Sequence, residues 1–406
     1  MPPSPRKPRL AILFRYGAGE HIHFLPALPE LCEALSDTHE VHHFGFRSRE
    51  PIPPLLAAHA RIHTIGPRVR RQSETDKRLK ALLWLLMLPG LGLYLRIRKF
   101  EILFVDETLP LSALLLRLTH GGRIAMTVHD FFMDIYFLPN RGLRRIGRWI
   151  KALDLYAWRK LDHLFTRVEA ARDFLIKQGV PPDNITVAHD PCNLDLFCPR
   201  PQSRSAIRTQ WGFRPEHLVL VHHGVMHPNK GNDRILRAIA RVREDLPNLR
   251  LLLIGEGPEY ERLQQLVHEL ALTRHVRMTG WLGSMQEVAE TLNAGDLGLV
   301  MRIGGPGDHF HVTSTLVHNL AAGLPVLAAR LEGIQEIITE GKEGCMFDPV
   351  CEAEFDEKLR QFAQNPQRHI DMSRAARRTA EQKFDRNKIA LEMAAGLRRH
   401  APPPKP

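Results

Sequence analysis

The chain has 406 residues, a formal net charge of +11, and 44% hydrophobic and 25% charged residues. This length predicts two domains of about 200 residues each, and the composition excludes a chain that is disordered throughout. The basic surplus indicates an anionic partner, which by charge alone is nucleic acid, a membrane surface or an anionic substrate.

Short apolar runs alternate with helical patterns through the first half of the chain. The runs predict strands at residues 10–14, 41–46, 61–65, 102–105, 124–128, 164–166 and 185–188. Between them, the patterns predict helices over 20–35, 109–118 and 169–178. Strands that are separated by helices favour a parallel sheet covered on both faces.

One segment of the first half is unusually apolar. Residues 81–95 carry almost no polar side chain, and basic residues bracket them. The run is shorter than the roughly 20 residues that span a membrane, and Pro89 interrupts it. It is therefore either a buried helix of the first domain or an interfacial segment whose flanking cations meet anionic headgroups. A basic amphipathic pattern at 141–151 favours the interfacial alternative.

The second half repeats the alternation after a polar stretch at 197–205, which we interpret as the linker. Strands are expected at 218–222, 250–254, 276–279, 297–301 and 325–329, with helices over 232–243 and 258–271 and from residues 352, 372 and 385. The sequence thus predicts an α/β fold with domains at 1–200 and 201–384. A C-terminal helix and loose tail, 385–406, could pack back on the first domain. Ligands of such sheets bind at the carboxyl ends of the strands, so two facing sheets would make one cleft.

Several blocks of the second half occur in the order found in a known family. They read LVLVHHGVMHPNKG, LLLIGEGPE, VRMTGWLGS and HNLAAGLPVLAARLEGIQEII, between residues 218 and 347. Looser matches in the first half are RYGAGEHIHFLPAL, IAMTVHD, TRVEAARDFL and VAHDPCNLDLFCP. Together they resemble the retaining GT-B glycosyltransferases of family 4, also called glycosyl transferases group 1. The resemblance implies two Rossmann-like domains that face each other across a cleft, with the acceptor in the first and a nucleotide sugar in the second.

The resemblance implies a metal-independent hexosyltransferase that moves a sugar from a nucleotide sugar to a lipid-linked or polysaccharide acceptor, with retention. No Asp-x-Asp triplet, which would hold a metal, occurs in the sequence. We therefore expect neither a metal nor another cofactor, and charge on the leaving diphosphate must be met by a cation and backbone N–H groups.

The donor side of the expected site starts at a glycine-flanked turn. Lys230 and Gly231 precede a predicted helix, where an ammonium group and helix N–H groups can meet phosphates. The family carries an Arg five residues before this Lys, and this chain has Val225. Gly17 and Gly19 follow the first strand and either let a backbone approach the donor closely or simply make a tight turn.

The catalytic candidates lie at the end of a strand in the first half. His129 ends the strand 124–128, and in the family's pattern this His contacts the donor sugar near the anomeric centre. Asp130 beside it is the weaker candidate. A histidine at a strand end can equally be a structural residue.

The loop before the block HNLAAGLPVLAARLEGIQEII departs most from the family's pattern. Where the family has two Glu residues, alignment on AAGLPV places Phe310 and His318. His318 could bind the ribose, and Asp308 could replace the missing acid. Donor contacts are also expected from Glu336, which matches the family's Glu, and from a helix start that offers caps and N–H groups, namely Thr313, Ser314 and Thr315.

Two other functions stay open. One is a catalytically weak binding or partner protein on the same fold, which is favoured by the departures from the family pattern at Val225, Phe310 and His318. The other is a nucleotide-sugar 2-epimerase, which fits the order of the blocks less well. Nucleic acid is not expected because no aromatic-basic motif occurs. Five cysteines without a CxxC pair, and no secretory signal, predict a cytoplasmic protein that is either free or peripheral on the inner face of a membrane.

Overall fold

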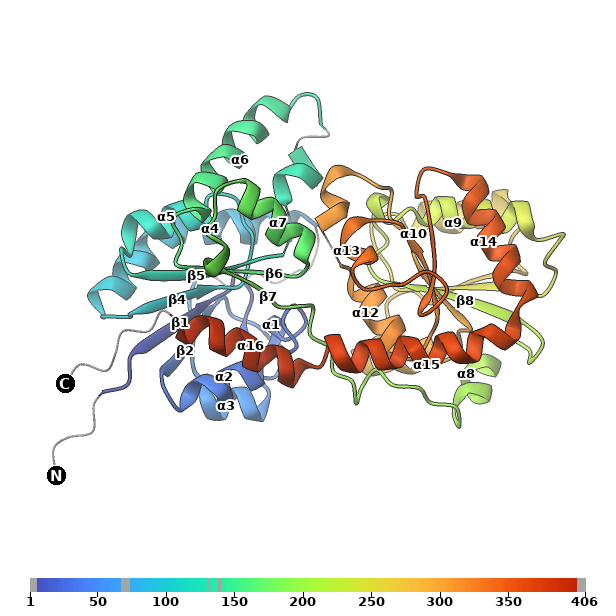
Figure 1. The fold of residues 1–406 in the computed structure, drawn as a ribbon, viewed down its shortest axis with the longest axis horizontal. Helices are drawn as coiled ribbons and strands as arrows, with labels where there is room; N and C mark the ends of the chain where they lie inside the picture. The colour runs from blue at the N-terminus through green and yellow to red at the C-terminus, as the bar shows by residue number, and fades with distance from the viewer. Residues whose placement is uncertain (1–5, 67–73, 130, 138–139, 311, 400–406) are drawn as a thin grey trace. The chain divides into compact units, whose positions relative to one another are not determined.

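The computed structural model describes residues 6–66, 74–129, 131–137, 140–310 and 312–399. The chain folds into two compact units (Figure 1). Unit 1 comprises residues 1–191 and 386–406, and unit 2 comprises residues 192–385. The chain therefore passes from unit 1 to unit 2 between residues 191 and 192, several residues before the domain boundary expected at residue 200.

Unit 1 contains a seven-stranded sheet in the order β3-β2-β1-β4-β5-β6-β7. Every strand pair is parallel. The strands are β1 (Arg9–Leu13), β2 (Glu40–Gly45), β3 (Arg61–Thr64), β4 (Ile102–Val105), β5 (Arg123–Val128), β6 (His163–Thr166) and β7 (Ile185–Val187). Because all strands run the same way, their carboxyl ends meet at one edge of the sheet.

Helices cover both faces of the unit 1 sheet (Figure 1). One face carries α2 (Leu28–Ser36), α3 (Pro54–His59) and α16 (Arg386–Arg398). The other carries α4 (Glu74–Ile97), α5 (Ser112–Thr119), α6 (Arg144–Trp158) and α7 (Glu169–Lys177). Short helical segments complete the unit: α1 (Ala18–His21), the π-helix η1 (Met133–Phe137) and η2 (Pro182–Asn184).

The last helix is part of the core of unit 1. Ile389, Ala390, Met393, Ala394 and Leu397 of α16 are buried in one cluster with apolar residues of α2 and of the sheet. At its ends, Arg386 pairs with Glu30, and Arg398 hydrogen-bonds the carbonyl oxygen of Ala34. Helix α16 therefore completes unit 1, although all of unit 2 precedes it in the chain.

Helix α4 has one buried face and one exposed face. Its segment Arg78–Ile97 is long and apolar enough to cross a membrane, with a mean hydropathy of 1.4, and 28% of that window is buried. Trp84, Leu88 and Leu95 are fully buried in unit 1. These side chains anchor α4 to unit 1. The helix therefore has both the burial expected of a domain helix and the exposed apolar residues expected of an interfacial segment.

Apolar side chains of three neighbouring helices are exposed on unit 1. Helix α5 contacts both α4 and α6. The pattern at 141–151 lies on α6 from Arg144 onward, while the helix itself continues to Trp158. We call the following set the apolar–basic surface: the exposed residues Leu79, Leu82, Leu86, Leu93, Ile97, Leu118, Ile146, Trp149, Leu153 and Tyr156, with Arg141, Arg144, Arg145 and Arg148. The exposed fraction is 72% at Leu118, 70% at Leu86 and 69% at Trp149, which is a large apolar exposure for three neighbouring helices.

Unit 2 contains a six-stranded parallel sheet in the order β10-β9-β8-β11-β12-β13. The strands are β8 (Leu218–His223), β9 (Leu249–Ile254), β10 (Val276–Met278), β11 (Leu297–Val300), β12 (Val326–Ala329) and β13 (Gly344–Phe347). Its longer helices are α8 (Arg204–Gln210), α9 (Asn232–Val242), α10 (Tyr260–Glu269), α11 (Met285–Leu292), α12 (Ser314–Ala321), α14 (Glu352–Gln364) and α15 (Pro366–Lys383). Short segments are η3 (Pro228–Lys230), η4 (Pro306–Phe310) and α13 (Glu332–Gln335).

The predicted class, two α/β domains with parallel sheets, is confirmed. The expected helix over 20–35 is wrong in its continuity, because α1 ends at His21 and α2 begins at Leu28. Pro26 lies in the break, where its ring and missing N–H disfavour a continuous helix. The expected helix over 109–118 begins later, at Ser112.

Candidate functional site

The carboxyl edge of the unit 1 sheet gathers polar side chains that follow neighbouring strands. Asp106 follows β4, His129 follows β5 and Arg167 follows β6. His43 lies on β2, and His21 ends α1, after the turn that follows β1. This edge is therefore where the topology of a parallel sheet places a ligand site.

Asp106 lies at the centre of a hydrogen-bonded network. One carboxylate oxygen, Oδ2, lies 2.8 Å from Nε2 of His21, and the other, Oδ1, lies 3.1 Å from Nε2 of His129. His21 Nδ1 is in turn 3.0 Å from Nε2 of His43. Arg167 lies beyond His129, with its Nη2 3.4 Å from His129 Nδ1, and forms an ion pair of 3.2 Å with Asp190.

These contacts fix the protonation pattern of His129. A guanidinium group can only donate, so Nδ1 of His129 accepts from Arg167, and the ring proton is on Nε2, where it faces Asp106. The backbone N–H of His129 donates to Thr108 Oγ1 at 2.8 Å. With 24% of its side chain exposed, His129 is oriented by its partners but remains accessible from solvent.

Burial and hydrogen bonding set the charges of this network. Burial by itself would raise the pKa of Asp106, but His129 and His21 hold it well below its usual value, so the carboxylate is ionised. Burial lowers the pKa of His21 despite its bond to Asp106 and lowers that of His43 well below its usual value. The centre of the network is thus one carboxylate that accepts from two imidazoles.

Gly17 and Gly19 lie at the same edge, after β1, but their missing side chains have a structural reason. A Cβ at Gly17 would lie 2.3 Å from the Cβ of Ser48, and one at Gly19 would lie 2.5 Å from the carbonyl oxygen of Glu50. The loop after β2 therefore packs directly against both glycines, and the tight-turn explanation accounts for them without a ligand. The other candidate of unit 1, Asp130, lies outside the described residues.

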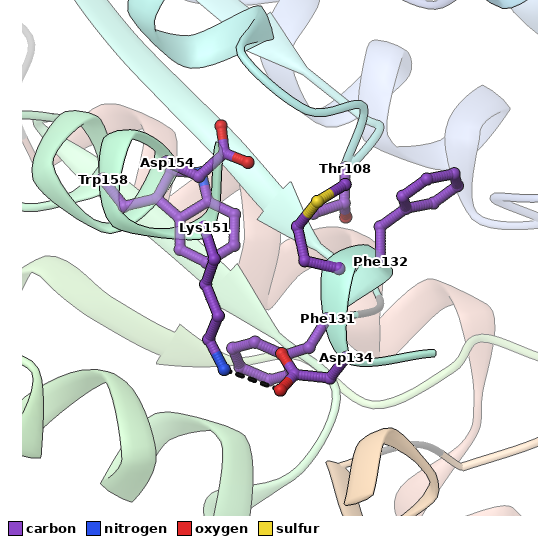
Figure 2. Close-up of a pocket in the computed structure, with 8 residues that line it drawn as sticks. Thr108, Phe131, Phe132, Asp134, Lys151, Asp154 and Trp158 are labelled. Carbon is purple, nitrogen blue, oxygen red and sulfur yellow. Dashed lines mark hydrogen bonds and ion pairs between the residues drawn. The ribbon is translucent and has the colours of Figure 1, made fainter. Parts of the chain in front are cut away.

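A shallow pocket of unit 1 lies between η1 and α6. Figure 2 shows Lys151, Asp154 and Trp158 approaching it from α6, opposite Phe131 and Asp134. Thr108, which binds the backbone of His129, also lines it. No pattern in the sequence indicates this pocket, because its walls come from three separate segments.

In unit 2, Lys230 and Gly231 form the turn that leads into α9. Lys230 ends η3, and Gly231 has a φ of +61°, a left-handed conformation that favours glycine. A Cβ at Gly231 would also lie 2.8 Å from Met301 Cγ. The positive charge of Lys230 contributes to the lowered pKa of His222 and His223, after the larger effect of burial. Lys230 is therefore near the carboxyl end of β8.

The three hydroxyl residues at the start of α12 have different surroundings. Thr313 caps the helix by accepting from the N–H of Leu316 at 3.3 Å. Thr315 donates to the carbonyl oxygen of His223 at 2.9 Å and so joins α12 to the end of β8. Ser314 is exposed. Of the three, only Ser314 presents its side chain to solvent, while the helix N-terminus itself adjoins the end of β8.

His318 and Asp308 are engaged within unit 2. The His318 ring stacks on Phe197, with centroids 3.7 Å apart, and on His223, with centroids 5.1 Å apart. Asp308 is buried, accepts from the N–H of Gly305 at 2.9 Å and pairs with Arg302 at 3.5 Å. These contacts of His318 and Asp308 all lie within unit 2. The Nδ1 of His318 is buried and has no hydrogen-bond partner.

Glu336 lies at the end of α13, where its side chain is partly buried. Its carbonyl oxygen accepts from Lys383 at 2.7 Å. The structure thus places Lys230, Gly231, Asp308, Thr313, Ser314, Thr315, His318 and Glu336 in unit 2, and Gly17, Gly19 and His129 in unit 1. Within the described ranges, no group of three or more His, Cys, Asp or Glu side chains is arranged to hold a metal ion.

Sequence reasoning missed Asp106, Thr108 and Arg167. Asp106 comes directly after the buried strand ILFV, and Arg167 directly after HLFT. A polar residue at the carboxyl end of a buried parallel strand indicates a position at the ligand-binding edge of the sheet, so Asp106 and Arg167 could have been found from the sequence. Thr108 carries no such signal, because its role depends on its contact with His129.

Two family models match the chain, one over each half. Glycosyltransferase Family 4 matches residues 28–196, and Glycosyl transferases group 1 matches residues 203–379. Among solved structures, sucrose-phosphate synthase from Thermosynechococcus elongatus aligns with a TM-score of 0.77 and 18% identity, over 97% of this chain and 99% of that chain. HepE from Anabaena, in complex with UDP, aligns with a TM-score of 0.71 and 16% identity, over 96% of this chain and 100% of that chain. These likenesses show the GT-B fold.

Curated relatives include two mycobacterial enzymes. A GDP-mannose-dependent alpha-(1-6)-phosphatidylinositol dimannoside mannosyltransferase of Mycobacterium tuberculosis is 31% identical over 282 residues, which cover 68% of each chain. The corresponding monomannoside mannosyltransferase of Mycolicibacterium smegmatis is 27% identical over 256 residues, which cover 61% of this chain and 63% of that relative. The chain therefore belongs to the glycosyl transferases group 1 family of GT-B glycosyltransferases.

Proposed function

We propose that the protein transfers a hexose from a nucleotide sugar to a lipid-linked acceptor at the cytoplasmic face of a membrane, with retention and without a metal. The observation that carries the acceptor class is the apolar–basic surface of unit 1. A protein that draws its acceptor from a bilayer must bind close to that bilayer, and this surface has the chemistry to do so.

The donor half of the proposal rests on unit 2. Lys230 lies near the carboxyl end of β8, and the N-termini of α9 and α12 adjoin the ends of β8 and β11. Backbone N–H groups at helix starts and an ammonium group together suit a diphosphate. HepE, which has the same fold, binds UDP and UDP-glucose, whereas the mycobacterial relatives depend on GDP-mannose.

The acceptor half rests on unit 1. The exposed apolar residues of α4 and α6 form stripes at helical spacing, as in Ile146, Trp149, Leu153 and Tyr156. Arginines accompany the α6 stripe, and each basic residue near an anionic bilayer contributes about 1 kcal/mol of attraction. Several relatives act on phosphatidylinositol mannosides, which is the same general class of acceptor.

The test combines a donor panel with vesicles. Purified protein is incubated with UDP and GDP sugars, with and without vesicles of anionic phospholipid and with a membrane lipid extract, and nucleotide release and glycosylated lipid are measured by mass spectrometry. We expect release from one class of donor, a glycolipid product, and sedimentation with anionic vesicles that weakens as salt rises. Transfer to soluble polysaccharide, without vesicle binding at low salt, would refute the lipid-linked acceptor.

The second candidate is a catalytically weak binding protein on the same fold. The stacking of His318 between Phe197 and His223 favours it, because this residue occupies a position where the family has an acid and its ring is engaged within unit 2. Val225 also leaves the donor site with one cation fewer than the family pattern. Nucleotide binding without turnover across the whole donor and acceptor panel would support this candidate.

A further inference from the structure

Arg302 carries a buried positive charge that its surroundings satisfy only in part. The residue follows β11, and 7% of its side chain is exposed. Among the described residues, its guanidinium group has one ion-pair partner, Asp308, with Nη1 3.5 Å from Oδ1. That distance exceeds the roughly 2.7–2.9 Å of a hydrogen bond between charged groups, and Arg302 Nε is buried without a hydrogen-bond partner in the described part of the chain. Since a guanidinium group is rich in N–H donors, this arrangement leaves donors of Arg302 available to a ligand.

The end of β11 runs alongside the turn between η3 and α9. A Cβ at Gly231 would lie 2.8 Å from Met301 Cγ, and the N–H of Ile303 donates to the carbonyl oxygen of Asn229 at 3.3 Å. Met301 and Ile303 flank the buried arginine, and the residues that they contact flank Lys230. The two basic residues are therefore held in adjacent segments of unit 2.

The charges of Lys230 and Arg302 act on the same imidazole ring. The pKa of His222, on β8, is lowered to about 4, chiefly by burial. A hydrogen bond to the carbonyl oxygen of Leu299 opposes this shift, whereas the positive charges of Lys230 and Arg302 add to it. Both cations thus lie close to the carboxyl ends of β8 and β11, the neighbouring strands at which the order of the sheet reverses. Ligands of open α/β sheets bind at such a point.

A diphosphate carries more negative charge than one ammonium group can neutralise. The family's pattern has an arginine five residues before Lys230, and this chain has Val225 there, with 49% of its surface exposed. A guanidinium group meets phosphate oxygens with two parallel N–H···O bonds, which an ammonium group does not provide. Arg302 offers such a group next to the Lys230 turn, from a different strand end. The charge that is missing at Val225 is thus available from the end of β11.

A structural ion pair with Asp308 is the alternative explanation for Arg302. Asp308 also accepts from the N–H of Gly305 at 2.9 Å, so its carboxylate is held in η4 without the arginine. For a purely structural pair, loss of one partner leaves a buried charge and destabilises the fold, whereas loss of both partners does not. Binding of an anion depends on the arginine itself, so the two explanations predict different behaviour of single and double variants.

We propose that Arg302 is the second cation of the donor site and binds the diphosphate of the nucleotide sugar together with Lys230. This assignment deepens the proposed function and rests on it. Asp308 holds the guanidinium group in place through the long ion pair, and the other N–H donors of the group bind phosphate oxygens. The family's pattern does not imply this role, because it puts its second cation at the position of Val225.

The test measures nucleotide binding by the full chain with calorimetry. The probes are UDP and GDP, with uridine and guanosine as the matching probes that lack phosphate. The variants are Arg302→Gln and the double variant Arg302→Gln/Asp308→Asn, which leaves no unpaired buried charge and remains informative if the single variant fails to fold. Arg237→Gln, at an exposed position of α9 in the same unit, is the matched control. Urea unfolding of each protein shows whether it is folded.

We expect both Arg302 variants to bind the preferred nucleoside diphosphate about 10- to 100-fold more weakly than the wild-type protein, because each lacks a charged donor to the phosphates. Binding of the matching nucleoside should be unchanged, and Arg237→Gln should bind both ligands as the wild type does. A diphosphate affinity that the Arg302 variants retain, or that falls in step with the nucleoside affinity, would overturn the assignment.

The same titrations separate this assignment from the proposed function. If the wild-type protein binds a nucleoside diphosphate and both Arg302 variants bind it equally well, the role of Arg302 is refuted and the donor site in unit 2 stands. If the wild-type protein binds neither UDP nor GDP, the proposed function itself fails.

Discussion

His129 and Asp106 are joined by a hydrogen bond of 3.1 Å from Nε2 to Oδ1, although the two residues follow different strands. The other oxygen of the same carboxylate receives His21 at 2.8 Å. Asp106 therefore orients His129, and together with Arg167 it places the ring proton on Nε2.

Replacing Asp106 with Asn should disturb this arrangement with little change in shape. The amide presents an N–H₂ group to one of two imidazoles that themselves donate, so one hydrogen bond is lost, at a cost of about 1–3 kcal/mol in the free energy of unfolding. Misorientation of His129 should also lower the transfer rate by about 10- to 100-fold. Denaturant unfolding and turnover assays measure the two effects, with the exposed Asp183→Asn as control. Wild-type turnover in Asp106→Asn would show that the network does not serve the reaction.

Lys230→Ala tests the donor site. If the ammonium group binds the diphosphate, its loss should weaken nucleoside diphosphate binding by about 10- to 100-fold, since a hydrogen bond to a charged group contributes about 1.5–3 kcal/mol. Nucleoside binding should change much less. Calorimetric titration of both ligands provides the measurement, and the exposed Lys342→Ala, also in unit 2, is the matched control. An unchanged diphosphate affinity would remove Lys230 from the site.

Acid should destabilise unit 2 through its buried histidines. Burial lowers the pKa of His318 from 6.5 to about 3 and that of His222 to about 4. A lowered pKa means that the unfolded chain takes up protons below about pH 6.5 while the folded one does not, so stability is full above that pH and falls below it. For His318 alone the loss is about 2 kcal/mol at pH 5.

His318→Phe should therefore reduce the acid sensitivity. Phenylalanine can keep the stack on Phe197 but cannot take up a proton, so the difference in unfolding free energy between pH 7 and pH 5 should shrink by about 2 kcal/mol. Urea unfolding at the two pH values measures this difference. His268→Asn, at an exposed position of α10, is the control, and an equal effect of both substitutions would contradict the assignment to His318.

Membrane binding should depend on the outer faces of α4 and α6. Leu86→Glu combined with Trp149→Glu puts two charges in the apolar–basic surface and should lower sedimentation with anionic vesicles at least tenfold. Leu391→Glu changes another exposed leucine, in α16, with 60% of its surface accessible, and should leave binding unchanged. Equal losses in both proteins, or none in either, would show that this surface is not the one that binds lipid.

The sequence predicted the sheets far better than the contacts at their edges. Buried strands such as ILFV at 102–105 are short and continuously apolar, and each expected strand lies within a residue or two of an observed one. Strand β13 (Gly344–Phe347) was not predicted. The helix over 20–35 was overextended because its apolar pattern continues across Pro26, where the chain turns before α2. The π-helix at 133–137 is too short for periodicity to reveal.

The positions of some candidate residues were predictable from the chain, but their contacts were not. As expected from the pattern, His129 directly follows β5, and Lys230 directly precedes the turn into α9; their roles stay predictions. The surroundings of His318 could not be predicted, because its stacking partner Phe197 lies far earlier in the chain and before the second series of strands. The contacts of Asp308 with Gly305 and Arg302 could not be predicted either, because they depend on the local path of η4; its suggested role as a replacement for the missing acid stays a prediction.

The contribution of α16 to unit 1 has a consequence for biosynthesis. Five of its apolar residues belong to the core that α2 and the first strands form, yet a ribosome makes all of unit 2 before it reaches Arg386. At typical elongation rates of about 5–20 residues per second, the nascent first unit waits roughly 10 to 40 seconds for its final helix. During that interval its unfilled groove is a natural target for chaperones, while unit 2 can already mature on its own.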